Sequence, residues 1–398
     1  AGMAGGDSVT SAAVKEPNSL RIPTRLLPRR PWPWRPRIPA PDLRQMALRA
    51  QTFALALCVA TAGLVAAQTS APPSEALGPA PRDPDGRFVN FAGHASHGDL
   101  SVRIPFFWRR ITGVFRDRPG APPVTSNDGA FLRENAKHSE PTVTWVGHST
   151  LLVQMDHVTF LTDPIWSQTP SPVSFAGPKR FVPPGLAMED LPPIDFVVVS
   201  HNHYDHLDLP TLRALSERNA ATRFFVPLAN GRLLRDNGIR NVQELDWGAS
   251  VEHEGVQVYC VPAQHWSKRG LDDDREALWS SWVVIGPERR FYFSGDTGYF
   301  DGFGTIGEAL GPFDLAAVAI GAYEPRAMMK ESHMNPEEAI RAALDLRAAR
   351  ALAIHFGTFD LSDEPVDEPP VRFRKAAEDT DLGDERAWVF DIGETRSF

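Results

Sequence analysis

Short apolar runs separated by polar turn residues dominate the chain from Pro141 onward. Apolar runs of roughly four to eight residues are typical of buried strands. We therefore expect strands at 142–145, 150–155, 158–162, 196–199, 223–226, 242–245, 256–261, 279–285, 290–294, 313–320, 351–354 and 387–389. Helices are expected from Leu209 to about Arg218, before Gly238, from Asn335 onward and at 371–378. Because runs of strands alternate with helices, the pattern predicts a layered α/β domain over 141–398.

The region before this domain has a different pattern. A Pro/Arg tract in residues 1–45 cannot form a helix or a sheet ladder, so we expect a disordered extension. An uncharged apolar run follows Met46 and ends in small residues at 65–67, which is the pattern of a signal peptide that starts at Met46. This pattern predicts an exported protein, periplasmic or membrane-associated. We expect a linker at 68–87, which is rich in Pro, Gly and Ala.

Residues 88–140 are expected to form an arm packed on the catalytic domain. Within the arm, residues 104–111 combine large aromatic side chains with paired arginines. Two interpretations are open for this block. It either packs on the domain or makes a peripheral contact with a membrane surface, where aromatic rings enter the interface and arginines meet lipid headgroups.

Charge and cysteine content exclude some classes of function. The 398 residues carry a net charge of -9, and residues 1–67 contribute +6, so the remaining body is strongly acidic. This balance argues against a nucleic-acid partner, because such binding depends on neutralising phosphates with Lys and Arg. The two cysteines, Cys58 and Cys260, exclude a disulfide framework and a thiolate zinc finger.

The densest chemical signal directly follows the apolar run 196–199. Three imidazoles and two carboxylates lie between His201 and Asp208, and Asp208 is expected to cap the helix that starts at Leu209. His201 and His203 alternate, so they point the same way in an extended turn, whereas Asp205 and His206 follow a reversal. One loop can thus supply two metal ions, and imidazole with carboxylate suits zinc or a similar divalent ion.

Further candidate ligands stand just past the ends of other expected strands. His265 follows 256–261, Asp296 lies between glycines after 290–294, and His355 follows 351–354. Each residue by itself is also compatible with an ordinary turn or surface position. Their recurrence at strand ends favours one shared site, since ligands bind at the carboxyl edge of such sheets.

The order HxHxDH, His265, Gly295-Asp296 and His355 resembles the metallo-β-lactamase-fold hydrolases. Within that fold, several blocks resemble the N-acyl-phosphatidylethanolamine-hydrolysing phospholipase D family, from about Asp85 to the end of the sequence. These blocks are 145–149, 161–164, 177–181, 192–195, 264–269 and 321–326.

This resemblance implies an αββα sandwich with two zinc ions per chain. His201, His203 and His265 would hold one ion, Asp205, His206 and His355 the other, and Asp296 would bridge them. Asp163 would hydrogen-bond to a metal-bound histidine and orient it. The alternative interpretation of Asp163 is an ordinary turn residue before a proline. His333 matches a histidine that the lipase family uses for activity, and its alternative is a solvent-facing loop residue.

The implied reaction is phosphodiester hydrolysis of a phospholipid substrate. A hydroxide shared by the two ions would attack phosphorus, Asp205 would help to hold it, and His333 would protonate the leaving oxygen or hold the phosphate. Two alternatives stay open: hydrolysis of another substrate such as a sugar-phosphate lactone, and a non-enzymatic metal-binding or lipid-binding module. No G-x-S-x-G elbow and no G-x-x-x-x-G-K-[ST] phosphate loop are present, which argues against serine-nucleophile and nucleotide-hydrolysing chemistry.

Overall fold

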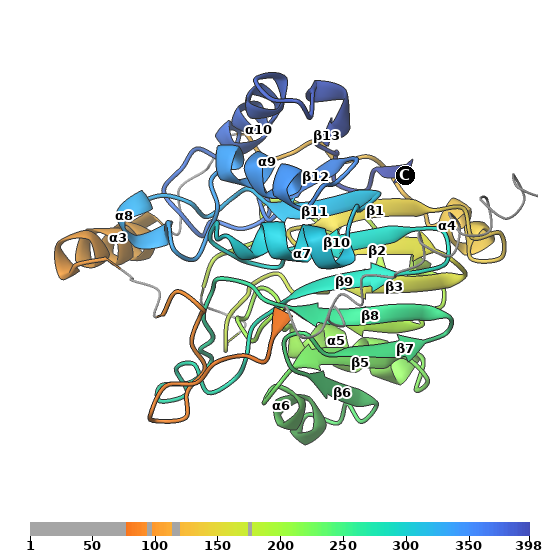
Figure 1. Ribbon diagram of the computed structural model, residues 1–398, viewed down its shortest axis with the longest axis horizontal. Helices are drawn as coiled ribbons and strands as arrows, with labels where there is room; N and C mark the ends of the chain where they lie inside the picture. The colour runs from red at the N-terminus through yellow and green to blue at the C-terminus, as the bar shows by residue number, and fades with distance from the viewer. Residues whose placement is uncertain (1–76, 94–97, 114–119, 174–176) are drawn as a thin grey trace, which may run out of the picture. The chain divides into compact units, whose positions relative to one another are not determined.

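A computed structural model describes residues 77–93, 98–113, 120–173 and 177–398 (Figure 1). The expected disordered extension, the signal segment that starts at Met46 and the first part of the linker lie outside these residues. Among the residues that are described, no helix is both long and apolar enough to cross a bilayer.

The first sheet is built from six consecutive strands in the amino-terminal half of the domain and from the last strand of the chain. Its order is β14-β1-β2-β3-β4-β5-β6. The strands are β1 (Thr142–Gly147), β2 (Thr150–Met155), β3 (Val158–Thr162), β4 (Phe196–Val198), β5 (Arg223–Pro227), β6 (Val242–Leu245) and β14 (Thr395–Ser397). The pairs from β14 to β3 are antiparallel, and those from β3 to β6 are parallel.

The second sheet takes up the following strands, in the order β13-β12-β11-β10-β9-β8-β7. These strands are β7 (Ser250–His253), β8 (Val256–Val261), β9 (Ser281–Ile285), β10 (Arg290–Phe293), β11 (Leu315–Ala319), β12 (Ala351–Ile354) and β13 (Ala387–Trp388). Here the pairs from β7 to β10 are antiparallel, and those from β10 to β13 are parallel. Each sheet is therefore mixed.

Side chains along the strands of the first sheet point alternately to its two faces, and both faces are buried. In β4, Phe196 and Val198 belong to the core between the sheets, whereas Val197 belongs to a second cluster on the outer face. Contact across the sheets is direct, because the rings of Phe160 and Phe291 lie 5.7 Å apart. Both faces need cover, so helices pack on the outside of the sandwich.

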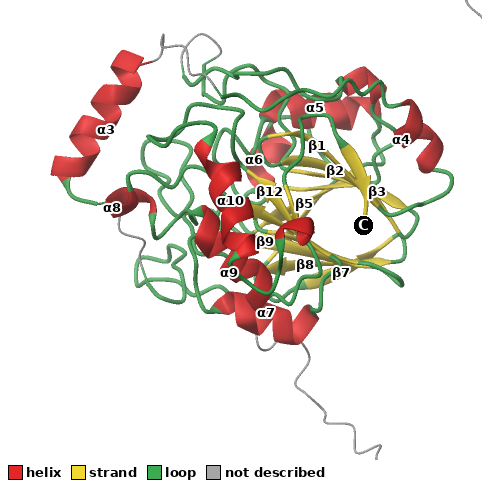
Figure 2. Ribbon diagram, turned by 90° about the horizontal axis from the view of Figure 1, so that it is seen from above, coloured by secondary structure: helices red, strands yellow, loops and turns green. Residues whose placement is uncertain are grey.

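The helices cover the outer faces as the predicted αββα order requires (Figure 2). The outer cluster of the first sheet contains residues of α5 (Leu209–Arg218) and α6 (Gly231–Asp236), and α7 (Gly302–Leu310), α9 (Pro336–Asp345) and α10 (Glu368–Glu378) pack on the second. Asn335 forms a capping box with Glu338 at the start of α9. The predicted αββα fold is confirmed.

Strand direction brings the functional loops to one edge. Two successive antiparallel pairings restore the original direction, so β1 runs the same way as β3, and β8 the same way as β10. The carboxyl ends of β1, β3 and β4 therefore lie at one edge of the first sheet, and those of β8, β10, β11 and β12 lie at one edge of the second. The loops after these strands form the candidate site.

The segment before β1 packs on the domain earlier than the sequence predicts. Leu77, in the expected linker, is 1% exposed and belongs to the core, and the amide of Ala80 donates to Asp246 at 3.2 Å. Phe88 in the expected arm is also buried in the core. The described part of 68–87 is thus anchored on the domain at Leu77 and Ala80.

The arm contains α3 (Leu100–Gly113) and the short α4 (Ala130–Asn135). Both views show α3 beside α8 (Arg326–Met329), away from the strands (Figures 1 and 2). Phe106 of α3 is 5% exposed, and Arg109 pairs with Asp363, so one side of the helix contacts the domain. Its other side is exposed.

Candidate metal centre

The structure brings all the predicted site residues to the edge where the two sheets meet. They reach it from both halves of the domain, in loops or turns that follow strands or precede a helix. These residues are Asp163 after β3, His201, His203, Asp205 and His206 after β4, His265 after β8, Asp296 after β10, His333 before α9 and His355 after β12.

The first group of candidate ligands consists of three imidazoles. His201 Nε2 lies 2.8 Å from His203 Nδ1, and His265 Nε2 lies 3.3 Å from the same atom. His201 and His265 are each 1% exposed. Three ring nitrogens that face one another at these distances suit a shared cation, since each can present a lone pair to it.

The second group adds a carboxylate to two imidazoles. Asp205 Oδ2 lies 3.3 Å from His206 Nε2 and 3.7 Å from His355 Nε2. Asp296 stands between the two groups: its Oδ2 is 3.1 Å from His206 Nε2 and 4.0 Å from His201 Nε2, and its Oδ1 is 3.1 Å from His355 Nε2. One carboxylate can therefore serve both groups.

The backbone at the turn carrying Asp296 leaves no room for a side chain at Gly295. This glycine has φ 54°, and a Cβ there would lie 2.4 Å from the Cβ of Ser200. The close approach holds the turn after β10 against the start of the loop after β4. A glycine is required at this position both for its conformation and for its size.

Hydrogen bonds behind the imidazoles fix their orientation. His206 Nδ1 lies 2.6 Å from Asp163 Oδ2, His201 Nδ1 lies 2.9 Å from Ser200 Oγ, and His265 Nδ1 lies 2.9 Å from the carbonyl oxygen of Ser332. Asp163 also accepts from the Ser200 amide at 2.6 Å and from its hydroxyl at 2.5 Å. A carboxylate behind a ligating histidine sets its tautomer and orientation.

Burial and mutual charge shift the protonation of the imidazoles. Burial lowers the pKa of His201 and His265 well below the ordinary value and that of His203 to about 4. Burial also opposes charge on His206 and His355, but Asp296 and Asp205 outweigh it: the pKa of His206 rises well above its usual value and that of His355 to about 9. Protons on the second group thus balance the buried carboxylates in the metal-free protein.

The carboxylates show the complementary effect. Burial alone would raise the pKa of Asp205 and Asp296, but the facing imidazoles, with His206 first, hold both pKa values well below the usual range. Two buried anions surrounded by imidazoles therefore stay charged, which is the electrostatic requirement for binding a divalent cation.

Buried nitrogen and oxygen atoms that lack hydrogen bonds show whether the residues fit metal ions. His206 Nε2, His355 Nε2 and Asp296 Oδ1 are buried and lie close to facing ligand atoms, but none of the three makes a hydrogen bond of good geometry. Buried polar atoms are normally hydrogen-bonded, so a cluster of unsatisfied donor atoms facing one point calls for a missing partner. A divalent ion that accepts nitrogen and oxygen ligands satisfies them, and the residues fit such a group.

His148, just past β1, is a site residue whose role the sequence did not reveal. Its Nε2 lies 3.0 Å from Asp205 Oδ2, and burial, together with the neighbouring His355, lowers its pKa to about 3. The neutral ring can donate to the carboxylate. A histidine directly after a strand is a signal for a site residue. The sequence pattern ends this strand at 145, whereas the strand extends to Gly147, so the pattern did not place His148 at a strand end.

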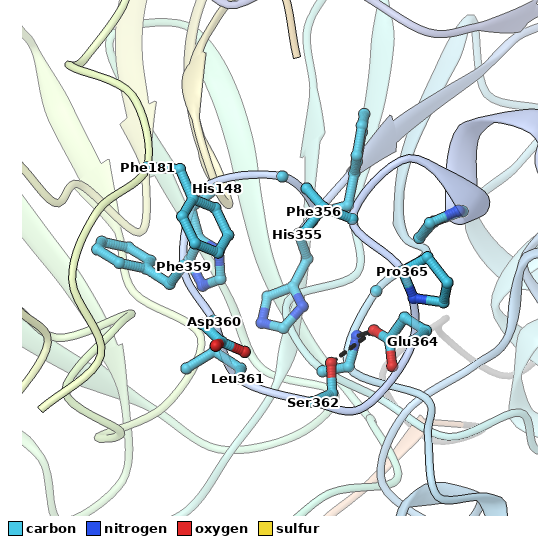
Figure 3. Close-up of a pocket in the computed structure, with 15 residues that line it drawn as sticks. His148, Phe181, His355, Phe356, Phe359, Asp360, Leu361, Ser362, Glu364 and Pro365 are labelled. Atoms are coloured by element: carbon cyan, nitrogen blue, oxygen red, sulfur yellow. Dashed lines mark hydrogen bonds between the residues drawn. The ribbon is translucent and has the colours of Figure 1, made fainter. Parts of the chain in front are cut away.

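His148 and His355 also border a hollow beside the centre. Figure 3 shows both rings pointing into it, with Phe181 and Phe359 on one side. The Glu364 carboxylate lies at the same hollow and accepts from the Ser362 hydroxyl. The opening thus combines aromatic and polar walls next to the candidate ligands.

A family model described as the beta-lactamase superfamily domain matches residues 158–356. The chain belongs to this superfamily. The matched segment contains every candidate ligand named above, from His201 to His355, and also Asp163 behind His206. A UPF0173 metal-dependent hydrolase of Methanopyrus kandleri is 29% identical over 257 residues, and the protein is a metal-dependent hydrolase of this superfamily.

Two curated relatives within the superfamily carry the same description. N-acyl-phosphatidylethanolamine-hydrolyzing phospholipase D 1 of Caenorhabditis elegans is 45% identical over 271 residues, which cover 65% of this chain and 76% of the relative. The mitochondrial N-acyl-phosphatidylethanolamine-hydrolyzing phospholipase D of Saccharomyces cerevisiae is 34% identical, covering 64% of this chain and 55% of the relative. The predicted resemblance to this lipase family is confirmed.

Solved structures agree on the fold. A metallo hydrolase from the archaeon Ignicoccus hospitalis superposes with a TM-score of 0.50 at 23% identity, covering 65% of this chain and 98% of the other. This likeness supports the αββα architecture of the superfamily.

Proposed function

We propose that the protein is a zinc-dependent phospholipase D that hydrolyses N-acyl-phosphatidylethanolamine to an N-acylethanolamine and phosphatidate. The observation that carries the proposal is the 45% identity to the nematode lipase over 271 residues. The geometry supports it, because two groups of ligands that share one carboxylate suit phosphodiester hydrolysis at paired ions. A phospholipid is the partner that this reaction requires.

In this proposal each group of ligands holds one zinc ion. His201, His203 and His265 would hold the first, Asp205, His206 and His355 would hold the second, and Asp296 stands between the two groups. Bound zinc acidifies water and polarises a phosphoryl oxygen. Asp163 keeps His206 oriented, and His148 keeps the Asp205 carboxylate in place beside the reacting group.

His333 completes the proposed machinery. Its Nδ1 lies 3.8 Å from Asp296 Oδ2, and its side chain is 13% exposed, so it borders the centre and stays accessible. Burial lowers its pKa to about 4, which leaves the ring neutral at neutral pH. A neutral imidazole carries one N–H, with which His333 would donate to a phosphate oxygen or to the departing alcohol oxygen.

A substrate panel tests the proposal. The zinc-loaded protein is incubated with N-acyl-phosphatidylethanolamine, phosphatidylcholine, a sugar-phosphate lactone and a thioester, and the products are identified by mass. We expect phosphatidate and N-acylethanolamine from the first lipid, and loss of both products in Asp296→Asn. Opening of the lactone or thioester without any phosphatidate would reject the substrate and leave the metal-dependent hydrolase intact.

We also propose that α3 contacts the membrane from which the lipid is taken. Leu100, Ile104 and Trp108 recur at helical spacing and are 66%, 64% and 67% exposed, and Phe107 beside them is 49% exposed. The helix sequence contains arginines and no acidic residue, which complements an anionic lipid surface. Together with the signal-peptide pattern at 46–67, this arrangement supports an exported, membrane-associated location.

Vesicle sedimentation tests the membrane contact. The double variant Ile104→Ser, Trp108→Ser should bind vesicles containing phosphatidylglycerol more weakly than the wild type, while hydrolysis of lipid dispersed in detergent is retained. Leu271→Ser is the matched control, because Leu271 is 90% exposed outside α3. Equal vesicle binding by all three proteins would reject this role for α3.

A further inference from the structure

We infer that Arg269 is a positioning residue that clamps the loop carrying four of the candidate ligands and, through it, fixes His203. This inference rests on the proposed zinc site and deepens it. Arg269 lies four residues after His265, so one loop contributes both a candidate ligand and the clamp.

The clamp joins both ends of the ligand-bearing loop. Arg269 Nη1 donates to the carbonyl oxygen of Asn202 and to that of Leu207, each at 2.9 Å. Asp205 and His206 lie between these two carbonyls. One guanidinium nitrogen therefore fixes the distance between the start and the end of the turn.

Tyr204 gives the same arginine a third contact in the middle of the loop. The Arg269 guanidinium carbon lies 4.0 Å from the centre of the Tyr204 ring, and the Tyr204 hydroxyl donates to the Arg269 carbonyl oxygen at 2.9 Å. The Arg269 amide donates in turn to the Asp273 carboxylate at 3.1 Å. The arginine is thus itself anchored, and the ring and guanidinium stack as a pair.

His203 is the ligand that depends most on this clamp. His201, His206 and His265 each have a hydrogen-bond partner behind the ring, as described above. The outer nitrogen of His203, Nε2, is buried and has no partner. Its ring contacts Trp266, with centroids 4.5 Å apart, but a ring contact does not fix a tautomer or a metal–nitrogen direction.

The backbone on either side of His203 therefore sets its position. Asn202 precedes it and Tyr204 follows it, and Arg269 holds both. A displaced residue in a metal site weakens ion binding, and changes behind the ligands typically cost about tenfold or more in affinity. The effect should fall on the group formed by His201, His203 and His265.

Metal titration of Arg269→Met tests the inference. The variant removes the donors and keeps an apolar chain of similar length. Arg218→Met is the matched control, because Arg218 also grips backbone carbonyls, those of Met188 and Leu191 at 2.8 Å, away from the centre. Zinc dissociation constants are measured by competition with a chromophoric chelator, and the visible spectrum of the cobalt(II)-loaded protein is recorded.

We expect one of the two zinc dissociation constants to rise at least about tenfold in Arg269→Met, with a changed cobalt spectrum, and neither to change in Arg218→Met. Both constants at the wild-type value in Arg269→Met, or equal losses in the two variants, would overturn the inference. Arg269→Gln, which keeps an amide donor, carries the test if Arg269→Met does not fold. A wild type that binds no zinc would instead reject the proposed zinc site itself.

Discussion

Replacement of Asp163 by Asn should weaken metal binding in both groups of ligands. The carboxylate is fully buried and receives the Ser200 hydroxyl and His206 Nδ1 on the same oxygen, Oδ2. Since Ser200 Oγ is also 2.9 Å from His201 Nδ1, a continuous chain of hydrogen bonds orients one ligand of each group. An amide nitrogen at the position of Oδ2 cannot accept these bonds.

The magnitude follows from the bonds that are lost. Each of the two lost hydrogen bonds to a charged acceptor contributes about 1.5–3 kcal/mol, so the free energy of unfolding should fall by roughly 3–6 kcal/mol. Loss of an orienting partner typically costs about 10–100-fold in metal affinity, which corresponds to roughly 1.4–2.7 kcal/mol. Both zinc dissociation constants should therefore rise by at least about tenfold.

The assay compares Asp163→Asn with Asp195→Asn in a zinc titration against a chromophoric chelator. Asp195 is half-buried and accepts from the Thr159 amide at 2.7 Å, at the start of β4 rather than at its functional end. We expect the control to bind zinc like the wild type. Zinc affinity in Asp163→Asn within about twofold of that control would show that Asp163 has no part in orienting ligands.

Three further predictions concern neighbouring features of the centre. Gly295→Ala places a Cβ 2.4 Å from Ser200 and should lower unfolding stability by about 2–4 kcal/mol in denaturant, whereas Gly304→Ala, with open space in α7, should be neutral or stabilising. His148→Leu should reduce turnover by about 10–100-fold, and His148→Gln, which keeps a donor for Asp205, should lose less; steady-state kinetics measures both. In the metal-free protein the pKa of His355 is about 9, so its proton stabilises the fold fully below pH 6.5, and this contribution is lost as the pH rises to about 9. Zinc competes with this proton, so zinc affinity should rise over the same interval. An affinity that calorimetry finds independent of pH would contradict the assignment.

Local pattern was sufficient for the main part of the fold. The strands from 142 to 162 and the helix from Leu209 to Arg218 were predictable because apolar periodicity and end signals agree there. The sequence did not predict α7, since three glycines lower its helix propensity, nor β7, which is polar and lies at a sheet edge. Tertiary packing stabilises both elements, and packing is not visible in a local pattern.

The candidate site was predictable to the extent that it follows strand ends. His265, Asp296 and His355 are far apart in the sequence, and their convergence follows from strand direction. The contacts of His148 and Arg269 were not predictable, because they depend on how separate loops meet above the sheets. Long-range hydrogen bonds of this kind leave no periodic trace in the chain.

Each group of ligands draws side chains from both sheets, and this has a consequence for the assembly of the fold. The loop after β4 extends from the first sheet, whereas His265, Asp296 and His355 extend from the second. Bound ions would therefore act as cross-links between two halves that are each nearly continuous in sequence. Ion binding adds its free energy to the docking of the halves, so amide hydrogen exchange at the facing strands β3 and β10 should slow when zinc is added.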